Sequence, residues 1–198
     1  MRTKLFTIGF LFFSLSSFAG EKELPKFFSD ILIKANMTFE MPKGLIETTV
    51  IENQQMNYEF AIKYPDKKFE VRYAIRPLGS MIEDYKMKIK NQKPGDSFAD
   101  PNKMYPASLQ AIAYNISGGK LAKSAEFDKT SVKEEFNADW GSTTFVEVNN
   151  TFSQGYKYCM MVAIHKDDCA DAYIFFMTDN KDQIMELALP AFYALKFN

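Results

Sequence analysis

The chain has one histidine, His165, and the residues near it in the sequence could support nucleophilic catalysis. Cys159 and Cys169 lie on either side of it, and Asp167 and Asp168 follow it closely. A thiol activated by an imidazole is a common nucleophile and base pair. Closeness along the chain does not aim side chains at each other, and such a pair must lie within hydrogen-bond reach. The sequence therefore favours a solvated histidine in a hairpin loop and predicts no catalytic residue.

The acidic residues around the same loop could bind a cation. Asp167, Asp168 and Asp171 place three carboxylates close together in the sequence, but no glycine lies among them. A calcium loop needs a glycine for its sharp turn, whereas aspartate is common in ordinary turns because its side chain bonds to the nearby backbone. A single histidine also excludes multi-histidine sites. We therefore predict no metal site and no cofactor.

The two cysteines are predicted to be free thiols. With the hairpin loop centred near Lys166, Cys169 would face about residue 163, and Cys159 would lie about four residues further along the opposite strand. That offset is on the order of 13 Å, whereas a disulfide needs Cα atoms within about 7 Å. A disulfide is the alternative, because an even number of cysteines in an exported protein favours one.

Two further features could mark an interaction surface. Four lysines lie between residues 86 and 93, directly after Glu83 and Asp84. We interpret this run as a solvated helix face rather than a patch for anionic lipids, because the acidic residues precede it. Trp140 is the only tryptophan of the chain, and a tryptophan beside a strand is more often packed in a core than used as an anchor for a partner.

The first nineteen residues have the pattern of a secretory signal peptide. Arg2 and Lys4 precede an apolar stretch over residues 5–15, and Ser17 and Ala19 supply small residues at the cleavage positions before Gly20. The apolar stretch is shorter than the roughly 20 residues that a membrane-spanning helix needs. No cysteine lies near the cleavage position. We therefore expect a periplasmic or secreted protein that is not lipid-anchored through an N-terminal cysteine.

Composition points to one folded domain of low net charge. Aromatic residues make up 15% of the chain, the formal net charge is −1, and the pI is about 5.9. The aromatic content argues against disorder, and nucleic-acid binding usually requires a clustered basic face and a high pI.

After the signal peptide (1–19), we predict a leader with a short helix over residues 20–36 and a single domain over residues 37–198. We expect no nucleic-acid partner and no membrane span after cleavage.

Alternation of apolar and polar residues predicts most of the strands. Residues 57–64 and 69–76 alternate strictly on either side of a turn that begins Tyr64-Pro65, which predicts a β-hairpin with one buried and one solvated face. Residues 156–164 and 170–177 are apolar at both parities, which is typical of central strands buried on both faces. Alternation over residues 144–148 predicts another strand. Residues 38–41 are predicted to form an edge strand that enters a turn at Pro42 and Gly44.

Helical spacing of apolar residues predicts the remaining elements. Short or amphipathic helices are expected over residues 24–32, 80–90 and 109–116, the last ended by Gly118 and Gly119. Ser131 and Glu134 form a capping box for another short helix. A C-terminal amphipathic helix is expected from Asn180 to residue 195, kinked by a proline, and residues 91–104 form a long loop. The sequence thus predicts an α+β fold with a mostly antiparallel sheet of about five to seven strands, one face covered by helices and the other partly open.

The order of these elements resembles the PsbP/Mog1/DcrB-like fold family. The resemblance rests on the entry at residues 39–44, the hairpin around Pro65-Asp66, the strands between Thr143 and Met177, and a last helix ending at residues 194–197. It implies an antiparallel sheet flanked by helices and a mostly non-enzymatic role, of the bacterial envelope type because the chain is predicted to be exported. No partner-binding residue of that family maps onto this chain, so the resemblance assigns no site.

Three functions follow from the sequence as hypotheses. The first is an exported, non-catalytic envelope or secreted protein that acts as an interaction or accessory module for an unknown envelope or extracellular protein. The second is a binding protein for a small apolar ligand, with a cavity lined by aromatic residues. The third, which the sequence favours least, is an enzyme that uses His165. A closed pocket with a few convergent polar groups would favour the second, and a buried His165 with a perturbed neighbour would favour the third.

Overall fold

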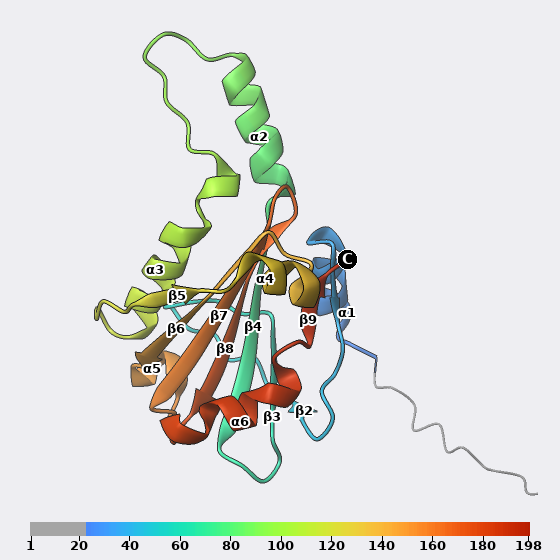
Figure 1. The fold of residues 1–198 in the computed structure, drawn as a ribbon, viewed down its shortest axis with the longest axis vertical. Helices are drawn as coiled ribbons and strands as arrows, with labels where there is room; N and C mark the ends of the chain where they lie inside the picture. The colour runs from blue at the N-terminus through green and yellow to red at the C-terminus, as the bar shows by residue number, and fades with distance from the viewer. Residues whose placement is uncertain (1–22) are drawn as a thin grey trace, which may run out of the picture.

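The computed structural model describes residues 23–198, so the predicted signal peptide lies outside the described residues. Within this range the chain forms a seven-stranded sheet in the order β2-β3-β4-β8-β7-β6-β5, with every neighbouring pair antiparallel (Figure 1). The strands are β2 (Ile46–Glu47), β3 (Phe60–Lys63), β4 (Phe69–Pro77), β5 (Ser124–Glu126), β6 (Trp140–Glu147), β7 (Tyr158–Lys166) and β8 (Ala170–Thr178). A second, two-stranded sheet pairs β1 (Met37–Phe39) with β9 (Leu195–Phe197).

Helices flank the large sheet, so the predicted α+β fold is confirmed. The α-helices of the described part are α1 (Lys26–Lys34), α2 (Gly79–Lys90), α3 (Tyr105–Ile116), α4 (Lys129–Phe136), α5 (Asn150–Ser153) and α6 (Ile184–Ala188). Three 3₁₀ turns complete the list: η1 (Pro101–Lys103), η2 (Lys181–Gln183) and η3 (Leu189–Ala191). None of the helices in residues 23–198 is long and apolar enough to cross a membrane.

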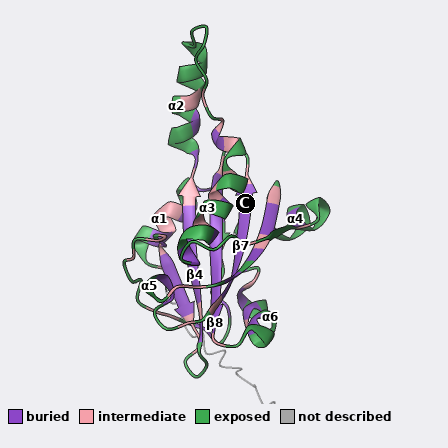
Figure 2. Cartoon of the chain, turned by 90° about the vertical axis from the view of Figure 1, so that its left-hand side faces the viewer, coloured by how far each residue is buried: buried purple, intermediate pink, exposed green. Residues whose placement is uncertain are grey.

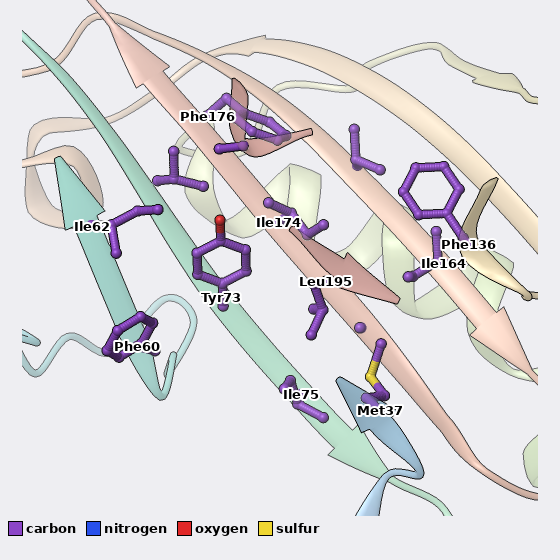
Figure 3. Close-up of a cluster of buried hydrophobic side chains, with 14 of the residues drawn as sticks. Met37, Phe60, Ile62, Tyr73, Ile75, Phe136, Ile164, Ile174, Phe176 and Leu195 are labelled. Carbon is purple, nitrogen blue, oxygen red and sulfur yellow. The ribbon is translucent and has the colours of Figure 1, made fainter. Parts of the chain in front are cut away.

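Both faces of the sheet carry a hydrophobic core. On one face, side chains of α1, α4, α6 and the β1–β9 pair pack against the central strands, as Figure 3 shows for Phe136, Ile174 and Leu195. On the other face, Leu109 of α3 and Phe152 of α5 pack against side chains from the same strands. The expectation of a partly open face is therefore wrong over the central strands. β7 and β8 are buried on both sides, as their continuous apolar sequence predicted.

The hairpin formed by β3 and β4 is present, but its polar face is only partly solvated and not fully as predicted. Arg72 of β4 is only 1% exposed. Its Nε donates to Glu70 over 2.6 Å, its Nη1 donates to the carbonyl of Phe152, and its guanidinium lies over the Tyr58 ring. Helix α5 covers this face, and its Phe152 carbonyl accepts a hydrogen bond from the guanidinium. The alternating pattern identified the strands correctly but could not show what covers them.

The C-terminal segment differs most from its prediction. The side chain of Asn180 caps the 3₁₀ turn η2 by accepting from the amide of Asp182 over 3.1 Å. The α-helix that follows ends at Ala188, because Pro190 cannot donate to a helical ladder. Leu195, expected on the last helical face, is instead a fully buried residue of β9. The C-terminal helical segment therefore exists over residues 181–191, and residues 195–197 form a strand.

The start of α4 is also set by a different residue from the one predicted. Asp128 is the N-cap, because its carboxylate accepts from the amides of Thr130 and Ser131, each over 3.0 Å. Ser131 therefore lies inside the helix and does not open it. The two apolar residues expected on its inner face, Val132 and Phe136, are both buried.

Helix α2 and the segment that returns from it, residues 91–104, extend away from one end of the sheet (Figure 1). We call this unit, residues 79–104, the arm. Figure 2 shows that most of it is exposed, in contrast to the buried sheet. Ile82 is the one residue of α2 that is buried. The predicted long loop is confirmed except for the turn η1, which closes it.

The C-terminal segment contributes Ile184 to the core, whereas Leu187 is only half-buried and packs against the core. We predict that Ile184→Ala lowers the free energy of unfolding by about 2–5 kcal/mol, because it removes a 4%-exposed side chain from a packed core. Met185→Ala, at the adjacent 58%-exposed position, is the control and should change stability by less than about 0.5 kcal/mol. Urea unfolding measures both, and equal losses would contradict the packing described.

Candidate functional site

His165 is not in a loop but is the penultimate residue of β7, and its side chain is only 1% exposed. The strands pair as far as Lys166 and Ala170, so the turn comprises residues 167–169. Asp168 adopts the left-handed conformation with φ 60°, which aspartate tolerates better than most residues. The sequence-based prediction placed the loop about two residues too early, and this shift moves His165 from solvent into the sheet.

The imidazole of His165 lies between two carboxylates. Its Nδ1 is 2.6 Å from Oδ1 of Asp171, and its Nε2 is 3.0 Å from Oδ1 of Asp167. An ionised carboxylate only accepts hydrogen bonds, so two ionised partners favour the form of the ring in which both nitrogens donate. Burial alone would lower the pKa of His165, but the hydrogen bonds and charges of Asp171 and Asp167 outweigh it and raise the pKa. Both ring nitrogens of His165 are therefore engaged by carboxylates, and these contacts favour the charged form of the buried imidazole.

An aromatic contact joins this ion cluster to helix α3. The ring of Tyr105, the first residue of α3, stacks on His165 with centroids 4.3 Å apart and also contacts Trp140 at 4.6 Å. A cation over an aromatic face is favourable. Burial, followed by the charges of Asp167 and other nearby acids, raises the pKa of Tyr105. Trp140 thus packs half-buried beside α3, in agreement with the core interpretation of this residue.

The turn between β7 and β8 also holds the base of the arm. The amide of Asp168 donates to the side chain of Asn102 over 2.9 Å, and the Asn102 amide group donates to the Asp168 carboxylate over 3.1 Å. Asn102 belongs to η1, the turn that closes the arm. The hairpin turn therefore fixes where the arm returns to the domain.

A hollow of about 360 Å³ lies next to this cluster, between the sheet and α3. Its floor comes from β4 and β8 and carries Arg76, Asp171 and Tyr173. Its walls come from α3, the arm, the residue between β4 and the arm, and the segment before β3. They are largely apolar, with Met56, Leu78, Met81, Pro101, Met104, Ala111 and Ile112, together with Gln55, Ser108 and Asn115. A concave site of this size with apolar walls and a few convergent polar groups is the usual form of a small-molecule site.

The charged groups on the floor are already paired. Nη1 of Arg76 donates to Oε1 of Glu59 over 2.8 Å, and Oε2 of Glu59 accepts the amide of Ile75 over 2.8 Å. Burial raises the pKa of Glu59, although Arg76 and the Ile75 amide act against it. Burial, followed by the charge of Asp171, raises the pKa of Tyr173, so its hydroxyl is neutral. The floor is polar but close to electrically neutral.

Neutral hydrogen-bonding groups also reach the hollow. The side-chain oxygen of Gln55 is buried and has no hydrogen-bond partner among residues 23–198. Leaving a buried acceptor unsatisfied costs about 1–3 kcal/mol. Sequence analysis missed this site entirely, because Gln55, Arg76, Met104 and Asp171 are far apart in the sequence and none belongs to a motif.

The other sequence candidates are not brought together into a site. Cys159 and Cys169 are free. Cys159 pairs with Met177, eight residues along β8 from Cys169, which corresponds to roughly 27 Å. The prediction of unbonded thiols is confirmed, although the loop centre on which it relied was misplaced. Burial raises the pKa of the Cys159 thiol, so it is not an activated nucleophile.

The acidic cluster of the hairpin is committed to contacts within the protein. Two of its carboxylates contact His165, and the third contacts Asn102. The described residues contain no group of three or more histidine, cysteine, aspartate or glutamate side chains that could hold a metal ion. The four lysines between residues 86 and 93 are exposed on the arm, and Lys88 pairs with Asp84 over 2.6 Å.

Neither a scan of protein-family models nor a search of curated proteins found a match for this chain. The site is therefore interpreted from its own geometry.

The raised pKa of His165 predicts how stability depends on pH. A histidine whose folded pKa is raised above its ordinary value of 6.5 stabilises the fold fully below that value and loses this contribution as the pH rises through the folded pKa. We expect the free energy of unfolding to fall over this interval in the wild type but not in His165→Gln. Because His165 is the only histidine, its imidazole C–H resonance reports its pKa directly by NMR.

The partner that raises this pKa can be tested in the same experiment. Asp171→Asn should lower the pKa of His165, because the buried carboxylate at 2.6 Å is lost. Asp168→Asn is the control, since this carboxylate contacts Asn102 rather than the imidazole. An unchanged His165 titration in Asp171→Asn would show that the carboxylate does not hold the imidazole in its charged form.

Proposed function

We propose that this protein is an exported, non-catalytic binding protein that holds a small amphipathic molecule between α3 and the sheet. The observation that carries the proposal is the hollow of about 360 Å³, with apolar walls and a floor of Arg76, Asp171 and Tyr173. Three of its wall residues are methionines, whose flexible side chains adapt to ligands of different shape. This supports the second hypothesis from the sequence, although the hollow is open to solvent rather than closed and its walls are rich in methionine rather than aromatic.

The state of His165 argues against the enzyme hypothesis. It is buried and its pKa is perturbed, which are features that often mark a catalytic group. Yet both of its nitrogens are bound to carboxylates, and its ring is covered by Tyr105. A general base needs a free nitrogen within reach of the substrate proton. We infer that His165 positions the floor of the hollow through Asp171 and performs no chemistry.

The pattern-level resemblance to PsbP/Mog1/DcrB-like envelope proteins is consistent with a non-catalytic role, and it stays a prediction because it rests on the order of elements alone. Export likewise stays a prediction from residues 1–19.

Filling the hollow tests the proposed function. We predict that the wild type binds the neutral apolar fluorophore N-phenyl-1-naphthylamine and that Ala111→Trp weakens this binding at least tenfold, because Ala111 lines the hollow. Ala107→Trp is the matched control, since it is another exposed alanine of α3 outside the lining. Fluorescence titration gives both affinities, with circular dichroism to verify folding. Equal binding by the two variants, or no binding by the wild type, would refute the site.

The arm favours the interaction hypothesis as a second function. Met87 and Ile89 of α2 are 59% and 41% exposed, and the helix that carries them projects from the domain (Figure 1). Apolar side chains in such a position fit a contact with a partner protein.

Site-specific crosslinking tests this second function. A photoreactive amino acid at position 87 should give a discrete crosslinked species in cells, because the arm would lie against a partner. The control is position 185 on α6, where the methionine is exposed to the same degree, 58% against 59%. A similar set of products from the two positions would show that the arm has no preferred partner.

A further inference from the structure

The ligand-binding hollow continues towards the arm. A second hollow of about 240 Å³ lies between α2 and the returning segment, and Tyr85, Phe98 and Ala99 contribute to its lining. Met81, Pro101 and Met104 border both hollows. These three residues are therefore a shared wall, and two of them are methionines, whose unbranched side chains can move aside. An elongated ligand could pass from the floor of the first hollow into the second.

The two hollows differ in what they offer a ligand. The floor of the first hollow carries Arg76 and Asp171, whereas the second is bordered mostly by apolar side chains of the arm, with Asp84 and Lys88 on α2 paired to each other. A molecule that occupies both would place a polar end on the sheet and an apolar chain under α2. This is the form of a single-chain amphiphile.

The paired charges on the floor of the first hollow determine whether the head group of a ligand can be charged. Arg76 is paired with Glu59 and Asp171 with His165, so each ion already has a partner of opposite sign. A charged head group placed there would lose its hydration without gaining an unpaired counter-ion, which is unfavourable. An uncharged head group avoids this cost.

A neutral acceptor selects a head group that donates a hydrogen bond. The side-chain oxygen of Gln55 is buried without a partner among the described residues, and Gln55 lines the first hollow. The terminal torsion of glutamine is broad, so its amide can turn towards a ligand. A hydroxyl or amide N–H would satisfy this oxygen, whereas an ether would not.

We infer that the natural ligand is an uncharged single-chain amphiphile with a hydrogen-bond-donating head, such as a long-chain alcohol or a monoacylglycerol. Its head lies near Gln55 and Arg76, and its chain passes Met81 and Met104 into the second hollow. The inference rests on the proposed function and specifies the class of ligand that the same site accepts.

A panel of ligands with one chain and different heads tests the inference. Competition with bound N-phenyl-1-naphthylamine at pH 7 should rank 1-decanol at least tenfold tighter than decanoate and decylammonium, and also tighter than 1-methoxydecane. In Gln55→Leu, the preference for 1-decanol over 1-methoxydecane should disappear, because the acceptor is lost. A charged ligand that binds as well as the alcohol, or an ether preference unchanged by Gln55→Leu, would overturn the inference. If the fluorophore does not bind at all, the proposed function fails instead.

Chain length tests the path into the second hollow. Each added methylene should tighten binding by about fourfold while the chain is still entering apolar space. Ala99 is exposed and lines only the second hollow, so Ala99→Trp should weaken 1-decanol at least tenfold and leave 1-hexanol within twofold of the wild type. Equal effects of Ala99→Trp on both alcohols, or none on either, would show that the chain does not reach the arm.

Discussion

The burial of three central strands on both faces is the constraint on which this structure depends. β4, β8 and β7 lie in the middle of the sheet, and hydrophobic clusters cover them from both sides. A polar side chain that is buried on these strands cannot reach bulk water and must find a partner inside the protein. Arg72 meets Glu70 and a carbonyl of α5, and His165 meets Asp171. The polar contacts of the domain follow from its sheet topology.

The candidate site follows from the same constraint at one end of the sheet. There the strand β8 brings Asp171 between His165 on one neighbouring strand and Arg76 on the other. Their opposite charges balance locally, which leaves a polar floor with little net charge. Helix α3 is held over this floor by the contact between Tyr105 and His165. The arm is held by Asn102 and Asp168. Helix α3 and the arm are thus both held by the hairpin of β7 and β8.

Sequence patterns correctly predicted the strands and helices that follow from local periodicity. They failed where contacts between distant parts of the chain determine the structure. The strict alternation over residues 57–76 and the two-sided apolar runs in β7 and β8 identified the central sheet, and helical spacing identified α3. The position of the turn after Lys166 depends on Asp168 adopting a left-handed conformation, which no periodicity encodes. Leu195 continued the helical spacing past Pro190, yet its pairing with Phe39 makes it a strand residue. The hollow is assembled from segments more than a hundred residues apart, so no local pattern could reveal it.

The pairing of β1 with β9 has a consequence for the order in which the protein can fold. Met37 lies opposite Phe197, and Phe39 lies opposite Leu195. Nearly the whole described chain therefore separates the two partners, so this small sheet can close only after residue 197 has been synthesised. Contacts between such distant residues form slowly, because a long loop must be ordered first. Until then β1 has no partner strand, and a nascent chain that has not yet reached residue 197 cannot adopt its final packing.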